Sequence, residues 1–464
     1  MQGTSAKKKA DTLNIVIVGC GKVGHTLTEQ LVAEGHDITI IDTNERVVRD
    51  AAEIFDVMGI TGNGASMRTL EEAGIRQADL IIAVTGSDEL NLLCCTIAKK
   101  FGGKLAAIAR VRNPDYAEEL SYLRNQLGLS MIINPELEAA REIARMLSRP
   151  QALAVSSFAK GHAELVRFKI PQDSVLCGKR IMDLESIFQF GFLVCAVERG
   201  GEVYIPNGPF ELQAGDEISI ISNTHDGHRI FESLGVRAQA ARSCMIIGGG
   251  KSSYYLAKQL LDQKMEVRII EKSRARCEEL STLLPGAIIV CGDGSEEAIL
   301  REEGIDNAEA FVALTGMDEE NILLTLFAKR NPGLKTITKI NRITFNDVID
   351  GLDLGSVVYP KYITSETIIA YVRAMRNTIG SNVETIYHMF DRRVEALEFR
   401  VGSEAPVVGV KLMDLKLKSN LRIACIGRRG RILFPRGQDA IEADDSVIVV
   451  TTHTGFGDIG DILA

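Results

Sequence analysis

Residues 14–24 read Asn-Ile-Val-Ile-Val-Gly-Cys-Gly-Lys-Val-Gly, and this stretch decides the fold. An apolar run, typical of a buried strand, leads into glycines and then into a helical pattern over residues 23–33. A strand, a glycine turn and a helix in this order are the setting that a dinucleotide-binding motif requires. The glycines permit a tight turn, a close approach of the backbone to a pyrophosphate, and close packing of the helix on the strand. The predicted nucleotide contacts are Gly19, Cys20, Gly21, Lys22, Val23 and Gly24.

Asp42 ends the next apolar run, 18 residues after Gly24. A carboxylate in this place accepts hydrogen bonds from the ribose hydroxyls and repels a 2′-phosphate. The pattern therefore favours NAD(H), or another adenine nucleotide with a free ribose diol, over NADP. The alternative is a turn that is rich in glycine only for packing. The strand, the glycines and Asp42 together favour nucleotide binding.

Three later turns are predicted to line the same crevice, because ligands of such sheets bind outside the carboxyl ends of the strands. Asn63 follows the third apolar run, where an adenine would lie. Thr85 and Gly86 follow the fourth, near the phosphates and the inner ribose. Arg110 ends the fifth run, where a guanidinium can pair with phosphate. A surface ion pair is an equally good interpretation of Arg110 from its position alone.

The chain is a tandem duplication. Gly19 corresponds to Gly248 at an offset of 229 residues, and Gly62 corresponds to Gly292 at an offset of 230. The second half thus contains a degraded copy of the site, with Ser253 in place of the third glycine and Lys339 in place of Arg110. Its predicted contacts, which are less certain than those of the first half, are Gly248, Gly249, Gly250 and Glu271.

Each half begins with short apolar runs that alternate with helical patterns, which is typical of a doubly wound parallel sheet. Each half ends in a shorter segment rich in strands and turns. The predicted fold class is α/β, a tandem duplication of a Rossmann-like doubly wound domain followed by a small β-rich α+β domain. The expected bounds are a polar tail at 1–12, Rossmann domains at 13–135 and 243–361, and small domains at 152–237 and 383–464.

Composition and charge exclude several classes of function. The formal net charge of −9 disfavours a nucleic-acid partner, because neutralising phosphates needs a basic face. No apolar run is long enough to span a membrane, and the apolar run after the basic tail lacks a signal-peptide cleavage site. The nine cysteines contain no CxxC pair, which favours reduced thiols. We therefore expect a cytoplasmic protein.

No catalytic or metal site is expected. The seven histidines are scattered along the chain, and no acid/base group stands in a recognisable catalytic setting. His225 and His228 lie in a polar loop with no further histidine or cysteine nearby, so solvated loop residues are the better interpretation. The chain also lacks a GxxxxGK[ST] loop and a nucleophile elbow.

Residues 109–116 read Ala-Arg-Val-Arg-Asn-Pro-Asp-Tyr, a run more specific than the glycine motif. Together with residues 19–24, Asp42, residues 83–89, Pro206 and Gly215-Asp216, it resembles the TrkA family of potassium uptake regulators. Proteins of this family contain tandem RCK domains, or regulators of potassium conductance. The likeness covers nearly the whole chain after the tail.

The resemblance implies a peripheral regulatory subunit on the cytoplasmic face of the membrane. It implies a ring of RCK domains that docks onto a potassium-translocating membrane subunit of the TrkH or TrkG kind. It also implies that NAD(H), and in some members ATP or ADP, binds the Rossmann crevices and gates the pore. Residues 19–23, Asp42, Thr85, Gly86 and Arg110 would then contact NAD. The paired domains can pack with pseudo-twofold symmetry, and helical segments 115–127 and 137–147 either bury a face against another domain or pack within their own.

Two alternatives remain open from the sequence. One is a soluble NAD-dependent oxidoreductase, disfavoured by the missing acid/base group. The other is an RCK-type sensor of a different channel or antiporter, which shares the fold and differs only in its partner.

Overall fold

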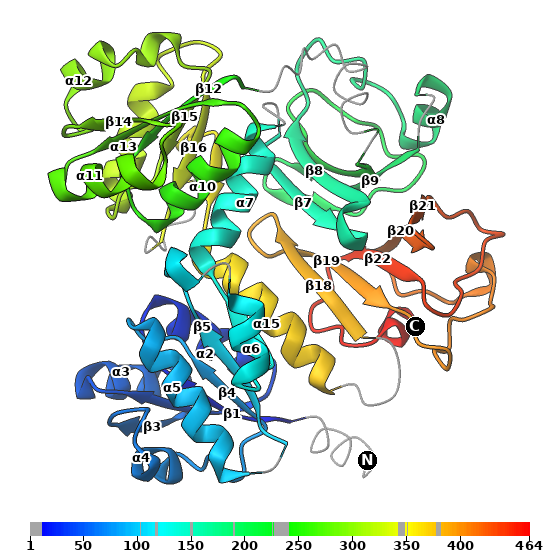
Figure 1. Cartoon of the computed structure of the whole chain (residues 1–464). Helices are drawn as coiled ribbons and strands as arrows, with labels where there is room; N and C mark the ends of the chain where they lie inside the picture. The colour runs from blue at the N-terminus through cyan, green and yellow to red at the C-terminus, as the bar shows by residue number, and fades with distance from the viewer. Residues whose placement is uncertain are drawn as a thin grey trace.

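The computed structural model describes residues 12–102, 104–116, 119–148, 152–188, 191–224, 226, 241–341, 349, 351–376 and 382–464. Four units follow one another along the chain and alternate in kind (Figure 1). Each half consists of a parallel six-stranded sheet with helices, followed by an antiparallel five-stranded sheet. This arrangement confirms the predicted α/β tandem duplication.

The first Rossmann unit is a parallel sheet in the order β3-β2-β1-β4-β5-β6. Its strands are β1 (Asn14–Val18), β2 (Asp37–Asp42), β3 (Met58–Thr61), β4 (Leu80–Ala83), β5 (Ala106–Arg110) and β6 (Met131–Ile133). Its helices are α2 (Lys22–Ala33), α3 (Glu45–Phe55), α4 (Met67–Glu72), α5 (Asp88–Ala98), α6 (Leu120–Gln126) and α7 (Pro135–Leu147). The strand order reverses between β1 and β4, which places the ligand crevice of such folds at the ends of these strands.

The second Rossmann unit repeats this order as β14-β13-β12-β15-β16-β17. Its strands are β12 (Ser243–Ile247), β13 (Glu266–Glu271), β14 (Ile288–Cys291), β15 (Ala310–Ala313), β16 (Lys335–Lys339) and β17 (Ser356–Val358). Its helices are α10 (Lys251–Asp262), α11 (Arg274–Leu283), α12 (Glu297–Glu302), α13 (Asp318–Ala328) and α15 (Pro360–Arg376).

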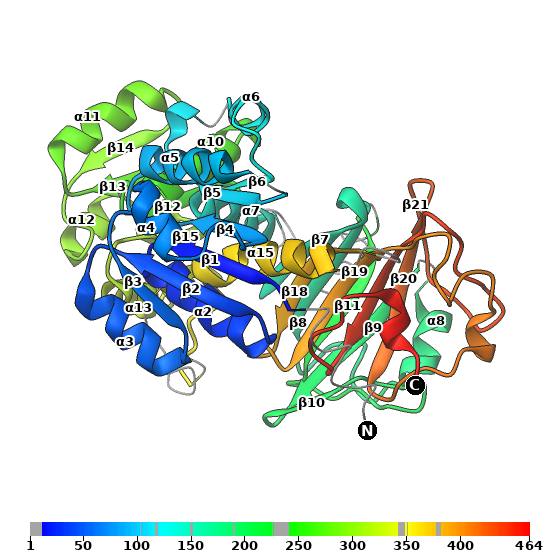
Figure 2. The same ribbon diagram turned by 90° about the horizontal axis from the view of Figure 1, so that it is seen from below.

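The two small modules are antiparallel sheets with the same topology. The first has β7 (Ala154–Phe158), β8 (Ala163–Lys169), β9 (Phe192–Arg199), β10 (Glu202–Tyr204) and β11 (Glu217–Asn223), with the short helix α8 (Leu184–Ile187). The second has β18 (Asn382–Met389), β19 (Val394–Arg400), β20 (Leu421–Arg428), β21 (Arg431–Leu433) and β22 (Ser446–Thr451). The modules lie side by side and share one buried apolar cluster, which includes Phe158, Leu165, Val394 and Ile448 (Figure 2).

The last helix of each Rossmann unit packs on the other Rossmann unit. Helix α7 lies against α10 and joins the apolar core of β12 and β13 through residues such as Ile143 and Leu147. Helix α15 lies against α2 and joins the core of β1 through Ile368 and Val372 (Figure 1). Segment 137–147 therefore buries its apolar face against another unit. In contrast, α6 within segment 115–127 has no buried residue.

Helix α15 also fastens the second module to the first Rossmann unit through Arg373, which is 3% exposed. The Arg373 guanidinium pairs with Glu34 at the end of α2, at 2.5 Å, and with Glu395 of β19, at 3.2 Å. Glu395 in turn lies 3.3 Å from Nε2 of His388, whose Nδ1 lies 2.9 Å from Glu366 of α15. We call this cluster of five residues the Arg373 junction. It joins the end of α2 to α15 and to strands β18 and β19.

Within these ranges, none of the helices has the length and apolar character needed to cross a bilayer.

Candidate nucleotide site

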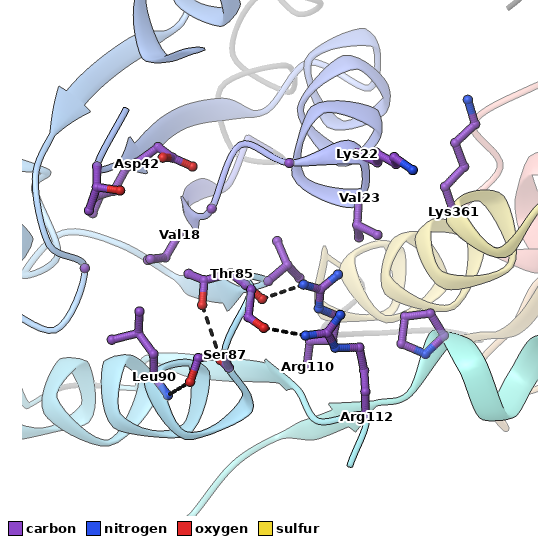
Figure 3. A pocket seen from close by; sticks show the side chains of 18 of the residues that line it. Val18, Lys22, Val23, Asp42, Thr85, Ser87, Leu90, Arg110, Arg112 and Lys361 are labelled. Atoms are coloured by element: carbon purple, nitrogen blue, oxygen red, sulfur yellow. Dashed lines mark hydrogen bonds between the residues drawn. The ribbon is translucent and has the colours of Figure 1, made fainter. Parts of the chain in front are cut away.

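A cavity of about 610 Å³ opens at the carboxyl ends of β1, β2, β4 and β5 (Figure 3). The predicted residues that line it are Gly19, Gly21, Lys22, Val23, Asp42, Asn63, Thr85, Gly86 and Arg110. The other two predicted residues of the first half, Cys20 and Gly24, lie beside it. The Cys20 side chain is buried in the core of the first Rossmann unit, and Gly24 packs against Gly19. We call this cavity the first crevice.

The glycine loop leaves the start of α2 open to a ligand. Gly19 has a φ of +101°, and a Cβ on Gly24 would lie 1.9 Å from the Gly19 carbonyl oxygen, so both positions require glycine. A Cβ on Gly21 would meet nothing within 4 Å, because this residue faces the crevice. Gly21 is also the N-cap of α2 and gives the helix no side-chain cap. The first amides of α2 are thus available to an anion, which the helix dipole also attracts.

Asp42 is held beside this loop at the end of β2. Its Oδ2 accepts a hydrogen bond from the Cys20 amide at 2.8 Å, and its Oδ1 accepts one from the Asn44 amide at 3.0 Å. Carboxylate oxygens have further lone pairs. Asp42 can therefore accept ribose hydroxyls without giving up the bonds that orient it.

Asn91 of α5 connects the ends of β4 and β5. Its Oδ1 accepts the Thr85 amide at 2.7 Å, and its Nδ2 donates to the Arg110 carbonyl oxygen at 2.9 Å. The Arg110 guanidinium donates to the Thr85 carbonyl oxygen. Burial, followed by repulsion from Arg112, lowers the pKa of Arg110 to about 10. Arg110 therefore lines the crevice and bonds to a backbone carbonyl oxygen.

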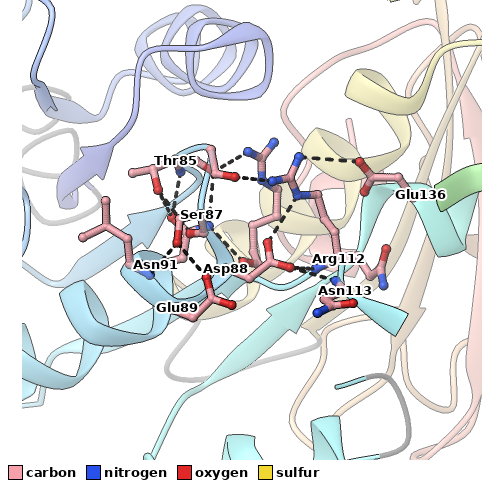
Figure 4. Close-up of polar contacts among 12 residues, drawn as sticks. Thr85, Ser87, Asp88, Glu89, Asn91, Arg112, Asn113 and Glu136 are labelled. Atoms are coloured by element: carbon pink, nitrogen blue, oxygen red, sulfur yellow. Dashed lines mark hydrogen bonds and ion pairs between the residues drawn. The ribbon is translucent and has the colours of Figure 1, made fainter. Parts of the chain in front are cut away.

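A polar network that no sequence motif predicted lies below Thr85 (Figure 4). Asp88 Oδ2 accepts the Arg112 and Asn113 amides, each at 2.8 Å, and Arg112 Nη1 lies 3.8 Å from Glu136. Arg112 and Glu136 both line the first crevice. The run at 109–116 contains Arg112 but gives it no role. Its position depends on Asp88, which begins α5 and lies far from it in sequence.

The second half also adds residues to the first crevice. Gly316, Asn341, Pro360 and Lys361 also line it, and Lys361 lies on the side opposite Asp42 (Figure 3). Helix α15 carries Lys361 into this position because it packs on the first Rossmann unit. The sequence had no motif that assigned any of these four residues to the first site.

The equivalent loops of the second half differ from those of the first around Glu271. Gly248 keeps a φ of +95°, and Glu271 accepts the Gly249 amide at 2.6 Å, as Asp42 accepts that of Cys20. However, Lys272 pairs with Asp293 at the positions of Thr43 and Asn63, both of which line the first crevice. Arg276 also donates to the Gly249 carbonyl oxygen at 2.7 Å.

Other positions of the second half keep or change the residues of the first. Lys339 stands in place of Arg110 and donates to the Leu314 carbonyl oxygen at 3.0 Å, and burial lowers its pKa to about 8. Ser253 replaces the third glycine and is fully buried. Gly250 caps α10 without a side-chain bond, as Gly21 caps α2.

In the part of the chain that the structure describes, no group of His, Cys, Asp and Glu side chains could hold a metal ion. His225 and His228 lie outside that part. Burial raises the pKa of the Cys20 and Cys94 thiols to about 12, so these cysteines are protonated side chains of the core.

Two Rossmann units with exchanged helices, each followed by an antiparallel module, define a tandem protein with a nucleotide-binding fold. A family model described as the TrkA-N domain matches residues 15–135 and 244–360. A model described as the TrkA-C domain matches residues 165–235 and 396–464. The chain is 34% identical over 437 residues to the Trk system potassium uptake protein TrkA homolog of Archaeoglobus fulgidus, covering 94% of this chain and 97% of the relative. It is 32% identical to Trk system potassium uptake protein TrkA of Vibrio alginolyticus, covering 96% and 97%. The chain therefore belongs to the TrkA family.

Solved structures show the same fold. The GsuK RCK domain superposes with a TM-score of 0.63 at 18% identity and covers 95% of this chain and 92% of that one. The GsuK channel bound to NAD gives a TM-score of 0.62 at 18% identity, covering 95% and 77%.

Proposed function

We propose that this protein is the nucleotide-binding regulatory subunit of a Trk-type potassium uptake system. It binds NAD(H), or alternatively ATP or ADP, in the first crevice. It acts at the cytoplasmic face of the membrane on a separate potassium-translocating subunit of the TrkH or TrkG kind. The observation that carries the proposal is the open first crevice, with Asp42 and the uncapped start of α2 side by side, in a chain of the TrkA family.

The residues of the first crevice fit an adenine dinucleotide. Asp42 would accept the ribose hydroxyls, and the amides of Gly21, Lys22 and Val23 would hold the pyrophosphate. Thr85 and Gly86 would lie near the phosphates and the inner ribose, and the Arg110 guanidinium would pair with a phosphate. In this role the nucleotide biases a conformational equilibrium by binding one state more tightly than the other. We expect it to bind without being turned over.

A ring of subunits would connect nucleotide binding to the membrane partner. Leu93 of α5 is 49% exposed, and Leu323 at the same position of α13 is 68% exposed. Leucines that are exposed at equivalent points of both halves suit a contact between copies of the chain. We therefore assign these two helices to the assembly surface of a homo-oligomer.

Two measurements on the full chain test this function. Calorimetric titration with NADH should give saturable binding, and incubation with NADH should give no oxidation at 340 nm. The protein should also co-purify with a coexpressed TrkH- or TrkG-like membrane subunit. A protein that binds no nucleotide and never co-purifies with this subunit would overturn the proposal, and turnover of NADH would favour an oxidoreductase.

A further inference from the structure

The charged residues of the first crevice are distributed unevenly. Asp42 lies at one end, and Lys361 rises from α15 on the opposite side (Figure 3). Between them lie Lys22, Arg110 and Arg112. Among the described residues, the only acidic side chain besides Asp42 that lines the crevice is Glu136, which pairs with Arg112. The end beyond the start of α2 is therefore cationic, and one of its four cations comes from the second half.

Lys361 stands at a place where the helix itself disfavours it. Both α7 and α15 begin with proline, and the next residue is Glu136 in α7 but Lys361 in α15. The start of a helix carries partial positive charge, which favours glutamate and opposes lysine. Residues that go against the preference of their secondary-structure position often belong to functional sites. The lysine is thus better explained by the crevice it lines than by the helix it starts.

The surroundings of Lys361 leave its charge usable by a ligand. Its side chain is half-buried, and its Nζ lies 4.8 Å from the centre of the Tyr362 ring. Burial lowers the pKa of Lys361, although Glu29 and Asp318 oppose this shift. A phosphate at the far end of the crevice would accept a charge-assisted hydrogen bond from the Lys361 ammonium group. This bond would offset the partial desolvation of the ammonium group.

We propose that Lys361 binds a phosphate of the nucleotide in the first crevice, so that the ligand bridges α2 of the first half and α15 of the second. This inference rests on the proposed function and adds to it a specificity-determining residue. The first site is incomplete without the second half. Nucleotide binding therefore holds α15 against the first Rossmann unit.

The test is a calorimetric titration of the full chain with NADH and with adenosine. The Lys361→Gln variant should bind NADH about tenfold more weakly, which corresponds to the loss of one charged hydrogen bond. It should bind adenosine, which has no phosphate, as the unmodified chain does. Lys361→Arg should restore most of the NADH affinity. Lys258→Gln, which removes an exposed lysine of α10 in the same half, should leave NADH affinity unchanged.

Asp42→Ala separates the two proposals. If Asp42→Ala weakens NADH binding and Lys361→Gln does not, the crevice binds nucleotide without Lys361 and the inference is wrong. An equal loss of NADH and adenosine affinity in Lys361→Gln would mean that the substitution deforms the crevice, which also overturns it. If the unmodified chain binds neither ligand, both the proposed function and the inference fail.

Discussion

Asp42 and Glu271 occupy equivalent positions in the two Rossmann units, and each accepts an amide of its own glycine loop. The difference lies in their neighbours. Asp42 faces an open crevice, whereas Lys272 and Asp293 form an ion pair beside Glu271. An exposed ion pair of this kind contributes little to the stability of the fold. The pair stands at the positions of Thr43 and Asn63, which line the first crevice.

Substituting these two carboxylates tests which crevice binds nucleotide. Asp42→Ala should weaken NADH binding about tenfold or more, because the ribose loses a charged hydrogen-bond acceptor. Glu271→Ala should have a smaller effect. Calorimetric titration of both variants measures the affinities directly. A larger loss in Glu271→Ala would reverse the ranking of the two sites.

At the scale of elements, a buried asparagine connects two strand ends in each Rossmann unit. Asn91 connects Thr85 to Arg110, and Asn321 connects Thr315 to Lys339 through the same pair of bonds. Both asparagines are fully buried. They set the spacing of the loops that follow β4 and β5 in the first half, and β15 and β16 in the second.

This repeat provides a matched pair of substitutions. Asn91→Ala and Asn321→Ala should each lower the free energy of unfolding by about 1–3 kcal/mol, because buried amides and carbonyls lose their partners. Only Asn91→Ala should also weaken NADH binding, since Thr85 and Arg110 line the first crevice. Urea unfolding and calorimetry measure the two effects. Equal weakening of NADH binding by both substitutions would contradict this assignment.

On the scale of the whole molecule, the Arg373 junction ties the first Rossmann unit to the second module. Burying charges is costly, and removing one partner of a buried ion pair leaves the other uncompensated. Arg373 has two carboxylate partners, and His388 lies between two carboxylates. The contact between these units therefore includes one histidine whose charge can change with pH.

The junction should make stability depend on pH. Burial lowers the pKa of His388, but hydrogen bonds to Glu366 and Glu395 outweigh burial and the repulsion from Arg392, so the pKa is raised above its usual 6.5. Protonated His388 thus stabilises the fold fully below pH 6.5, and this contribution is lost as the pH rises through the raised value.

Urea unfolding of the unmodified chain and of His388→Gln from about pH 6 to about pH 9 tests this effect. The difference in free energy of unfolding should be largest at the acidic end and should shrink toward the alkaline end. A difference that does not change with pH would show that His388 does not titrate at the junction.

The assembly of copies of the chain is a second property of the whole molecule. Leu93→Glu combined with Leu323→Glu places charges on the exposed faces of α5 and α13. If these helices form the ring contacts, light scattering after size exclusion should show a lower molar mass. The thermal unfolding temperature of the double variant should change little, because both leucines are exposed. An unchanged molar mass would place the assembly surface elsewhere.

The elements that were predicted well from the sequence are those with local signals. The glycine loop and Asp42 lie within one βαβ unit, so a motif and a spacing describe them. Lys361 reaches the first crevice only because α15 crosses to the other half. An amphipathic pattern does not say which sheet its apolar face will meet. The segment 137–147 remained open for the same reason. The lysine after Pro360, at a position where Pro135 is followed by glutamate, was the signal that could have revealed this contact.

The exchange of α7 and α15 bears on the origin of the chain. One half alone would leave the sheet face under the exchanged helix bare. Two identical copies of a single half could cover both faces by trading helices, as the two halves now do. The geometry therefore points to an ancestor of half this length that formed a homodimer. A duplication and fusion of its gene would then have joined the two subunits in one polypeptide. Once the halves were joined, the sequence of each could diverge separately. The second half could then acquire the Lys272–Asp293 ion pair while the first crevice stayed open.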